Sequence, residues 1–168
     1  MWSKRPRLHE SCYLGEQRYF LTFCTDGRHL AFAVPSNVKA AWLEILRAAR
    51  RHAFQVVAYV FMPDHLHLLV QGVDAASDLR AFVHLAKQRT AFGYAGTSAR
   101  RLSQPSYWDH VLRDEESTWA VIRYICDNPV RAELVIRAED YEFLGSGLMD
   151  RETLLRELAI RPVTLWQP

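Results

Sequence analysis

Two apolar runs separated by a turn signal make up residues 55–70, QVVAYVFMPDHLHLLV. The first run is rich in β-branched and aromatic residues, the second is apolar, and Pro63-Asp64 between them is typical of a turn. Gln55–Met62 and His65–Val70 therefore predict an antiparallel hairpin. The first run is apolar on both faces, which predicts a central strand of a sheet.

Further elements flank this hairpin. The predicted elements are a strand over Tyr19–Thr25, a helix after Pro35 capped by Ser36 or Asn37, a helix capped by Ser77, a short strand over Tyr107–Arg113, a helix from Asp114–Glu116 to near Asn128-Pro129, and a short helix around Arg151–Ala159. This order predicts an α+β, ferredoxin-like (RRM-like) sandwich, an antiparallel sheet with its helices packed on one face. We expect a single domain over residues 1–168, with a core over about residues 17–130 and a C-terminal tail over 131–168.

The composition is that of a globular protein. Hydrophobic residues make up 49% of the chain and charged residues 24%, which excludes a disordered or collagen-like chain. No apolar run approaches the roughly 18 residues of a membrane-spanning helix, and the first residues lack the apolar stretch of a secretory signal. The three cysteines, Cys12, Cys24 and Cys126, have no CxxC spacing, which favours reduced thiols. We therefore expect a soluble cytoplasmic protein.

Positive charge is concentrated in the first two thirds of the chain. The net charge of +2 divides into +5 over residues 1–52, +2 over residues 53–113 and −5 over residues 114–168. Of the 21 basic residues, 18 are arginine, whose planar fork suits phosphate. The candidate phosphate contacts are Arg5, Arg7, Arg18, Lys87, Arg89, Arg100 and Arg101. Composition alone leaves two interpretations open, a nucleic-acid partner or solvated surface charge.

Two histidines stand two residues apart at the start of the second run. Because side chains alternate along a strand, His65 and His67 point to one face and Leu66 to the other. Two neighbouring imidazoles can each give a ring nitrogen to one divalent ion, and polar rings in an apolar strand need partners. The pair therefore predicts a metal site, with ordinary sheet histidines as the alternative.

A tyrosine and an asparagine lie four residues apart near the end of the third predicted helix. Tyr124 and Asn128 share one helix face, so their side chains approach the same point. Taken alone, the pair is more typical of a half-buried core tyrosine and a helix C-cap before Pro129.

Three separated blocks of sequence resemble the single-tyrosine HUH transposases of bacteria, and among these the REP-associated tyrosine transposases. The blocks are Phe61–Leu69 (FMPDHLHLL), Ser106–Glu116 (SYWDHVLRDEE) and Tyr124–Ala132 (YICDNPVRA). The resemblance spans roughly Arg5 to Tyr141. The chain departs from the family at Glu133, where relatives often have glycine, and at residues 143–146 (FLGS), which replace a more usual Trp-Ser-Ser.

The resemblance implies roles for four residues. His65 and His67 fall on the family's paired metal ligands, Asn128 falls on its third ligand, and Tyr124 falls on its nucleophile. By resemblance we expect an enzyme, dependent on Mg²⁺ or Mn²⁺, that nicks single-stranded, hairpin-forming (REP-like) DNA. It would transfer strands through a 5′-phosphotyrosine intermediate. The resemblance also favours a monomer over a dimer, and a location at the bacterial nucleoid.

Other functions stay open at this point. One is a nucleic-acid-binding module without catalysis, either a domesticated transposase or an RRM-like RNA binder. It would use the aromatic strand at Tyr19–Phe23 but leaves the histidine pair without a purpose. Another is a zinc hydrolase, which would use His65 and His67 for turnover without a protein–DNA adduct.

Overall fold

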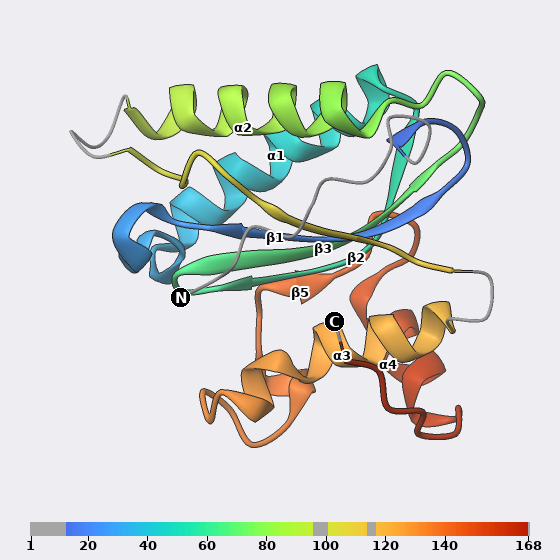
Figure 1. Cartoon of the computed structure of the whole chain (residues 1–168). Coiled ribbons are helices and arrows are strands. Elements are labelled where there is room, and N and C mark those ends of the chain that lie inside the picture. The colour runs from blue at the N-terminus through green and yellow to red at the C-terminus, as the bar shows by residue number, and fades with distance from the viewer. Residues whose placement is uncertain (1–12, 96–100, 114–116, 168) are drawn as a thin grey trace.

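A five-stranded antiparallel sheet lies at the centre of the computed structural model, which describes residues 13–95, 101–113 and 117–167 (Figure 1). The strands are β1 (Arg18–Cys24), β2 (Phe54–Met62), β3 (His65–Gly72), β4 (Trp108–Val111) and β5 (Leu144–Gly145). Their order in the sheet is β4-β1-β3-β2-β5, and all neighbours are antiparallel. The first four strands have the ferredoxin-like order, so the predicted α+β class is confirmed.

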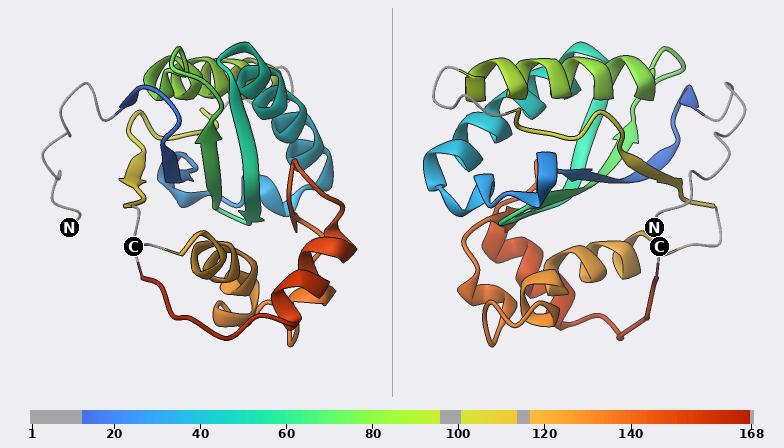
Figure 2. Two further views of the ribbon diagram at one scale, coloured as in Figure 1. Left: turned by 90° about the vertical axis from the view of Figure 1, so that its right-hand side faces the viewer. Right: turned by 60° about the vertical axis from the view of Figure 1, so that its left-hand side comes forward.

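Helices cover both faces of the sheet (Figures 1 and 2). One face carries α1 (Pro35–Arg51) and α2 (Leu79–Ala95), and the other carries α3 (Thr118–Arg131) and α4 (Arg151–Ala159). Single 3₁₀ turns occupy Asp26–Arg28, Ala31–Ala33 and Ala138–Asp140. The expectation of helices on one face holds for α1 and α2 only. The second face is also apolar, and α3 and α4 bury it.

Alternation along the strands divides the buried side chains into two cores. Leu66 and Leu68 of β3 pack in the core under α1 and α2, whereas Leu69 packs in the core under α3 and α4. Leu21 and Phe20 of β1 divide in the same way. The central strands β1 and β3 therefore each contribute side chains to both cores.

The predicted hairpin forms, and its register places the histidines in the middle of the sheet. Met62 pairs with His65 and Val60 with His67 across the hairpin, and Thr22 of β1 pairs with His67 from the other side. β3 is the third of the five strands, and β2 lies between it and β5. The prediction of an interior strand for β2 is confirmed.

α1 begins at Pro35, so the predicted caps at Ser36 or Asn37 are wrong. Proline suits the first helical position because the N–H that it lacks has no partner there. The side-chain amide of Asn37 instead donates to the carbonyl of Ala31 at 2.8 Å.

Ser77 does not cap α2 either. Its hydroxyl donates to the carbonyl of Ala53 at 2.7 Å, a contact 24 residues away in the chain. The carboxylate of Asp78 accepts from the N–H of Ala81 at 3.1 Å, which is the bond that a cap makes.

α3 continues past its predicted end at Asn128-Pro129 and stops at Arg131. The chain leaves the helix at Glu133, which has a left-handed φ of 56°. The N–H of Glu133 bonds to the carbonyl of Val130, and the next N–H bonds to the carbonyl of Pro129. These paired bonds form a Schellman motif, whose left-handed residue is best supplied by glycine. The chain thus carries glutamate at a position that favours glycine.

The remaining predicted boundaries agree with the structure in part. Asp114–Glu116 lies outside the described residues, and Ser117 caps α3 by accepting from the N–H of Ala120 at 3.3 Å. α4 has its predicted bounds. β5 was not predicted. Its second residue, Gly145, lies against the Tyr59 ring, and a Cβ at this position would come within 2.9 Å of the phenol oxygen. None of the helices in the described ranges is long and apolar enough to cross a membrane.

Candidate active site

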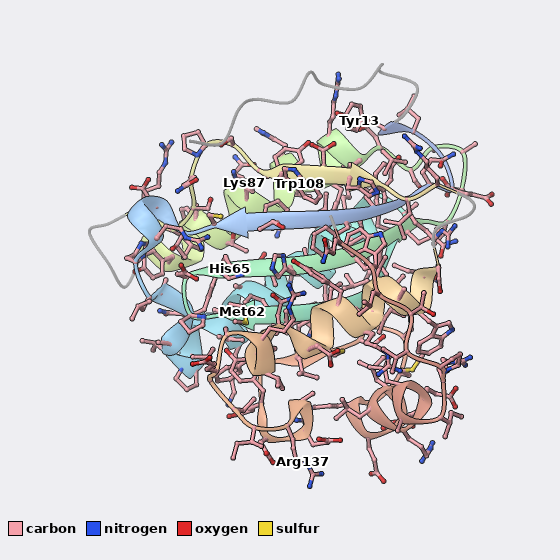
Figure 3. All side chains as sticks on the ribbon, turned by 60° about the horizontal axis from the view of Figure 1, so that its bottom comes forward. Tyr13, Met62, His65, Lys87, Trp108 and Arg137 are labelled. Atoms are coloured by element: carbon pink, nitrogen blue, oxygen red, sulfur yellow. The ribbon has the colours of Figure 1, made fainter. Side chains whose placement is uncertain are left out.

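His65 and His67 lie side by side and face α3. Because Leu66 and Leu68 fill the core under α1 and α2, the two histidines point to the opposite face of β3. Their Nε2 atoms are 3.2 Å apart and their ring centroids 4.7 Å apart. Figure 3 looks onto this face and shows His65 beside Met62, with α3 in front of the sheet. The expectation that both rings share one face is confirmed.

Each imidazole is held by a hydrogen bond at its other nitrogen. Nδ1 of His65 donates to Oδ1 of Asp64 at 2.6 Å, and the second oxygen of Asp64 pairs with Arg28 at 2.9 Å. Nδ1 of His67 lies 2.9 Å from the hydroxyl of Thr22. An ionised carboxylate only accepts hydrogen bonds, so the proton of His65 is on Nδ1 and Nε2 keeps its lone pair. Outer partners of this kind are typical of histidines that bind a metal ion.

Burial keeps both imidazoles neutral. It lowers the pKa of His65, although the hydrogen bond to Asp64 opposes the shift. Burial also lowers the pKa of His67, to about 3, and the adjacent imidazole adds to this shift. The guanidiniums of Arg28 and Arg131 act in the same direction. At neutral pH the two rings can therefore offer lone pairs to a cation, which protonated rings cannot.

The donor set fits one small cation. Two nitrogens 3.2 Å apart can both bind an ion at about 2.1 Å, a usual metal–imidazole distance. No three His, Cys, Asp or Glu side chains in the described part of the chain are grouped so as to hold a metal ion. Among the described residues, a third protein ligand would be of another type, such as the amide oxygen of Asn128.

Tyr124 lies on the same side of the sheet as the histidines. Within one chain, the ring centroids of Tyr124 and His67 are 6.1 Å apart. Phe20 of β1 is stacked on His67 at 5.2 Å and meets the Tyr124 ring edge-on at 5.7 Å, so both rings pack against one aromatic side chain. Tyr124 is only partly buried. The half-buried Tyr124 ring and the buried His67 ring therefore lie on the same side of the sheet, packed against one aromatic side chain.

Comparison with known proteins identifies the family. Residues 15–127 match the family model described as transposase IS200 like. The chain belongs to the IS200-like transposases. The REP-associated tyrosine transposase of Escherichia coli (strain K12) is 25% identical over 99 residues, which are 59% of this chain and 58% of that protein. An uncharacterized protein of Haemophilus influenzae is also 25% identical, over 74% of this chain and 86% of its own length.

A solved structure shares the transposase fold. It is a REP-associated tyrosine transposase bound to a REP hairpin, and it matches with a TM-score of 0.72 and 20% identity. The match covers 95% of this chain and 87% of that chain. The match to the Escherichia coli relative, in contrast, spans less than two thirds of that protein.

Asn128 of this IS200-like transposase lies one helical turn after Tyr124, with its amide turned along its own helix. Nδ2 donates to the carbonyl of Tyr124 at 2.7 Å. This bond leaves the side-chain oxygen, the atom that binds metal ions, without a hydrogen bond to any described residue. Its assignment as the third ligand stays a prediction.

The seven predicted phosphate contacts of the transposase fall into three groups. Arg5, Arg7 and Arg100 lie outside the described residues. Arg18, Lys87 and Arg89 contact other parts of the chain. Arg101 is exposed.

The contacts of the second group are structural. Arg18 donates to the hydroxyl of Thr118 and so ties β1 to the start of α3. Arg89 pairs with Glu44 of α1 at 3.3 Å. Lys87 donates to three successive carbonyls in residues 104–106, and burial lowers its pKa to about 8, so it is still charged at neutral pH. A DNA contact by any of the three remains a prediction.

Sequence patterns did not indicate two residues that contact Tyr124. The guanidinium carbon of Arg131 is 4.7 Å from the centroid of the Tyr124 ring. Trp166, in the segment after α4, meets the same ring at 5.3 Å. Arg131 follows Tyr124 by seven residues, or two helical turns, and this spacing is a signal that could have found it. Trp166 lies in a segment without periodicity and carries no such signal.

Proposed function

We propose that this transposase cuts and rejoins single-stranded DNA through a covalent bond between Tyr124 and a 5′ phosphate. The observation that carries the proposal is the 6.1 Å between the rings of Tyr124 and His67 in one chain. At this distance the Tyr124 phenol, a group that can act as a nucleophile, lies beside one of two imidazoles that can bind a cation. Membership of the IS200-like family supports this assignment.

The proposed reaction exchanges one ester bond for another. The phenol oxygen of Tyr124 attacks phosphorus, an O–P bond forms and the P–O3′ bond breaks. The phenol loses its proton, and the departing 3′ oxygen takes up a proton to become a hydroxyl. Because the phosphotyrosine is itself a phosphodiester, a 3′ hydroxyl of the same or another strand can reverse the step without ATP.

The residues around Tyr124 would hold a divalent ion, Mg²⁺ or Mn²⁺. His65, His67 and Asn128 are its proposed ligands. When bound, such an ion polarises the phosphate and neutralises charge in the transition state. Two imidazole donors favour Mn²⁺ or a softer ion over Mg²⁺. Asp64 holds His65 in the tautomer that metal binding needs.

Hairpin DNA is the proposed substrate. The related structure holds a REP hairpin, and the arginine-rich composition of this chain supports a phosphate-rich partner. Because Tyr124 lies beside His67 of its own chain, a monomer carries all of the proposed catalytic residues. A DNA substrate would locate the protein in the bacterial cytoplasm, at the nucleoid.

A denaturing gel tests the proposal. Labelled single-stranded DNA with a palindromic hairpin and randomised unpaired flanks is incubated with the protein and Mn²⁺. We expect a band shifted by the mass of the protein, lost with EDTA and in Tyr124→Phe. Tyr94→Phe is the matched control, since that phenol bonds to His29 on the α2 side of the sheet and should leave the adduct intact.

The other outcomes separate the alternatives. Tyr124→Phe should bind the DNA as tightly as the wild type, and an adduct that persists in this variant would contradict the nucleophile. DNA binding by the wild type without any adduct would favour a binding module. Cleavage without an adduct would favour a metal hydrolase.

A further inference from the structure

Arg131 has surroundings unlike those of the other arginines near the site. It lies at the end of α3, is exposed, and places its guanidinium carbon 4.7 Å from the centroid of the Tyr124 ring. Arg28 pairs with Asp64, Arg18 bonds to Thr118, and other arginines bond to backbone carbonyls. Within the described residues, the N–H groups of Arg131 bond to no acceptor and pair with no carboxylate. Its donors are therefore available to a ligand.

The charged groups around Tyr124 favour the binding of an anion. Asp64, the carboxylate next to His65, is compensated by Arg28 at 2.9 Å. Asp127 is half-buried on α3, and within the described ranges no salt bridge joins it to Arg123 or Arg131. Arg131 thus places a positive charge over the Tyr124 ring without a salt bridge to any described carboxylate. A phosphodiester supplies one negative charge and two non-bridging oxygens, which match the planar fork of a guanidinium.

We propose that Arg131 binds the non-bridging oxygens of the phosphate that Tyr124 attacks. This inference rests on the proposed function. A phosphorus atom under attack lies about 3–3.5 Å from the phenol oxygen. That oxygen belongs to the ring against which the guanidinium rests, so the phosphate comes within reach of the Arg131 donors. Arg131 forms no covalent bond, and its charge serves both the attack and its reversal.

Arg131 has one plausible structural role that the test must separate from phosphate binding. A cation over an aromatic ring stabilises the position of that ring, so Arg131 could act only by holding Tyr124. A ring contact alone does not depend on the charge of the DNA. Removal of the charge from one phosphate therefore distinguishes the two roles.

The first experiment measures the rate of adduct formation on the DNA that the wild type cleaves. We expect Arg131→Gln to slow the reaction by about 10- to 100-fold, which corresponds to the usual contribution of a hydrogen bond between charged groups. Arg131→Lys, which keeps the positive charge, should recover part of the rate. Arg80→Gln is the matched control, since Arg80 lies 4.6 Å from the Tyr13 ring on the α2 side of the sheet and should react as the wild type does. Wild-type rates in Arg131→Gln would overturn the inference and leave the proposed function intact.

The second experiment measures DNA affinity in a Tyr124→Phe background, where the DNA stays uncut. One DNA carries the natural phosphate at the mapped cleavage position, and the other carries an uncharged methylphosphonate there. We expect Arg131→Gln to weaken binding of the natural DNA about tenfold or more and to change binding of the methylphosphonate DNA little. Equal losses on both would show that Arg131 acts through the ring and would overturn the inference. If the wild type forms no adduct on any hairpin, the proposed function fails, and the phosphate contact fails with it.

Discussion

The hydrogen bond between Asp64 and His65 leads to a quantitative prediction for metal binding. Asp64→Asn keeps the shape of the side chain and one oxygen that can accept from Nδ1 of His65, but it removes the negative charge. Replacing an outer carboxylate of this kind typically costs 10- to 100-fold in metal affinity, or about 1.4–2.7 kcal/mol. The geometry decides where in that range the effect falls.

Two features of the structure act on the size of this effect. The retained acceptor replaces the 2.6 Å bond to His65 in part, which favours the lower end of the range. The substitution also leaves Arg28 without its partner at 2.9 Å, and an uncompensated guanidinium beside the imidazoles repels a bound cation. We therefore expect the Kd for Mn²⁺ to rise about 10- to 30-fold.

Calorimetric titration of the DNA-free protein with Mn²⁺ measures this effect directly. Asp74→Asn is the matched control, because its carboxylate caps the N–H of Ala76 at 2.8 Å, beyond the far end of β3 from His65. Thermal unfolding of both variants checks that they fold. The reasoning is refuted if Asp64→Asn binds Mn²⁺ within twofold of the wild type, or if Asp74→Asn loses as much affinity.

Two further predictions concern the end of α3 and the origin of the nucleophile. Glu133→Gly should raise the free energy of unfolding by about 0.5–1 kcal/mol, since glycine removes the cost of a left-handed φ but makes the unfolded chain more flexible. Glu142→Gly, at an exposed position with ordinary φ, should instead lower it, and chemical denaturation of both variants would expose an error if they shift alike. Mixing Tyr124→Phe with His67→Ala protein should restore no adduct on the gel, because Tyr124 lies beside His67 of its own chain. Recovered adduct in the mixture would mean that one chain supplies the tyrosine to another.

Local periodicity accounts for the parts of the fold that the sequence predicts well. The hairpin and the common face of His65 and His67 follow from alternation along a strand, which depends on neighbouring residues only. The predicted bounds of α4 are also local, and the structure shows Asp150 capping this helix by accepting from the N–H of Thr153. These features need no knowledge of the rest of the chain.

Tertiary contacts account for the parts that the sequence did not predict. The hydroxyl of Ser77 bonds to the carbonyl of Ala53 in a different loop, so a plausible cap serves another purpose. The sequence predicts a DNA contact for Lys87, but its ammonium donates to three carbonyls before β4. A sequence alone does not distinguish a basic side chain that binds a phosphate from one that binds a backbone carbonyl. The seven-residue spacing of Tyr124 and Arg131 indicates a shared helix face only if the helix continues through Pro129, where the sequence predicts its end.

The two faces of β3 connect the stability of the fold to the geometry of the site. Leu66 and Leu68 anchor the strand in the core under α1 and α2, and the histidines alternate with them on the other face. A shift of register by one residue would turn the imidazoles into the core under α1 and α2 and the leucines toward α3, so core packing fixes the direction of both rings. Phe20 extends this constraint to α3, because it packs on His67 and on Tyr124 at once. The distance between Tyr124 and His67 is therefore set by packing in the hydrophobic cores.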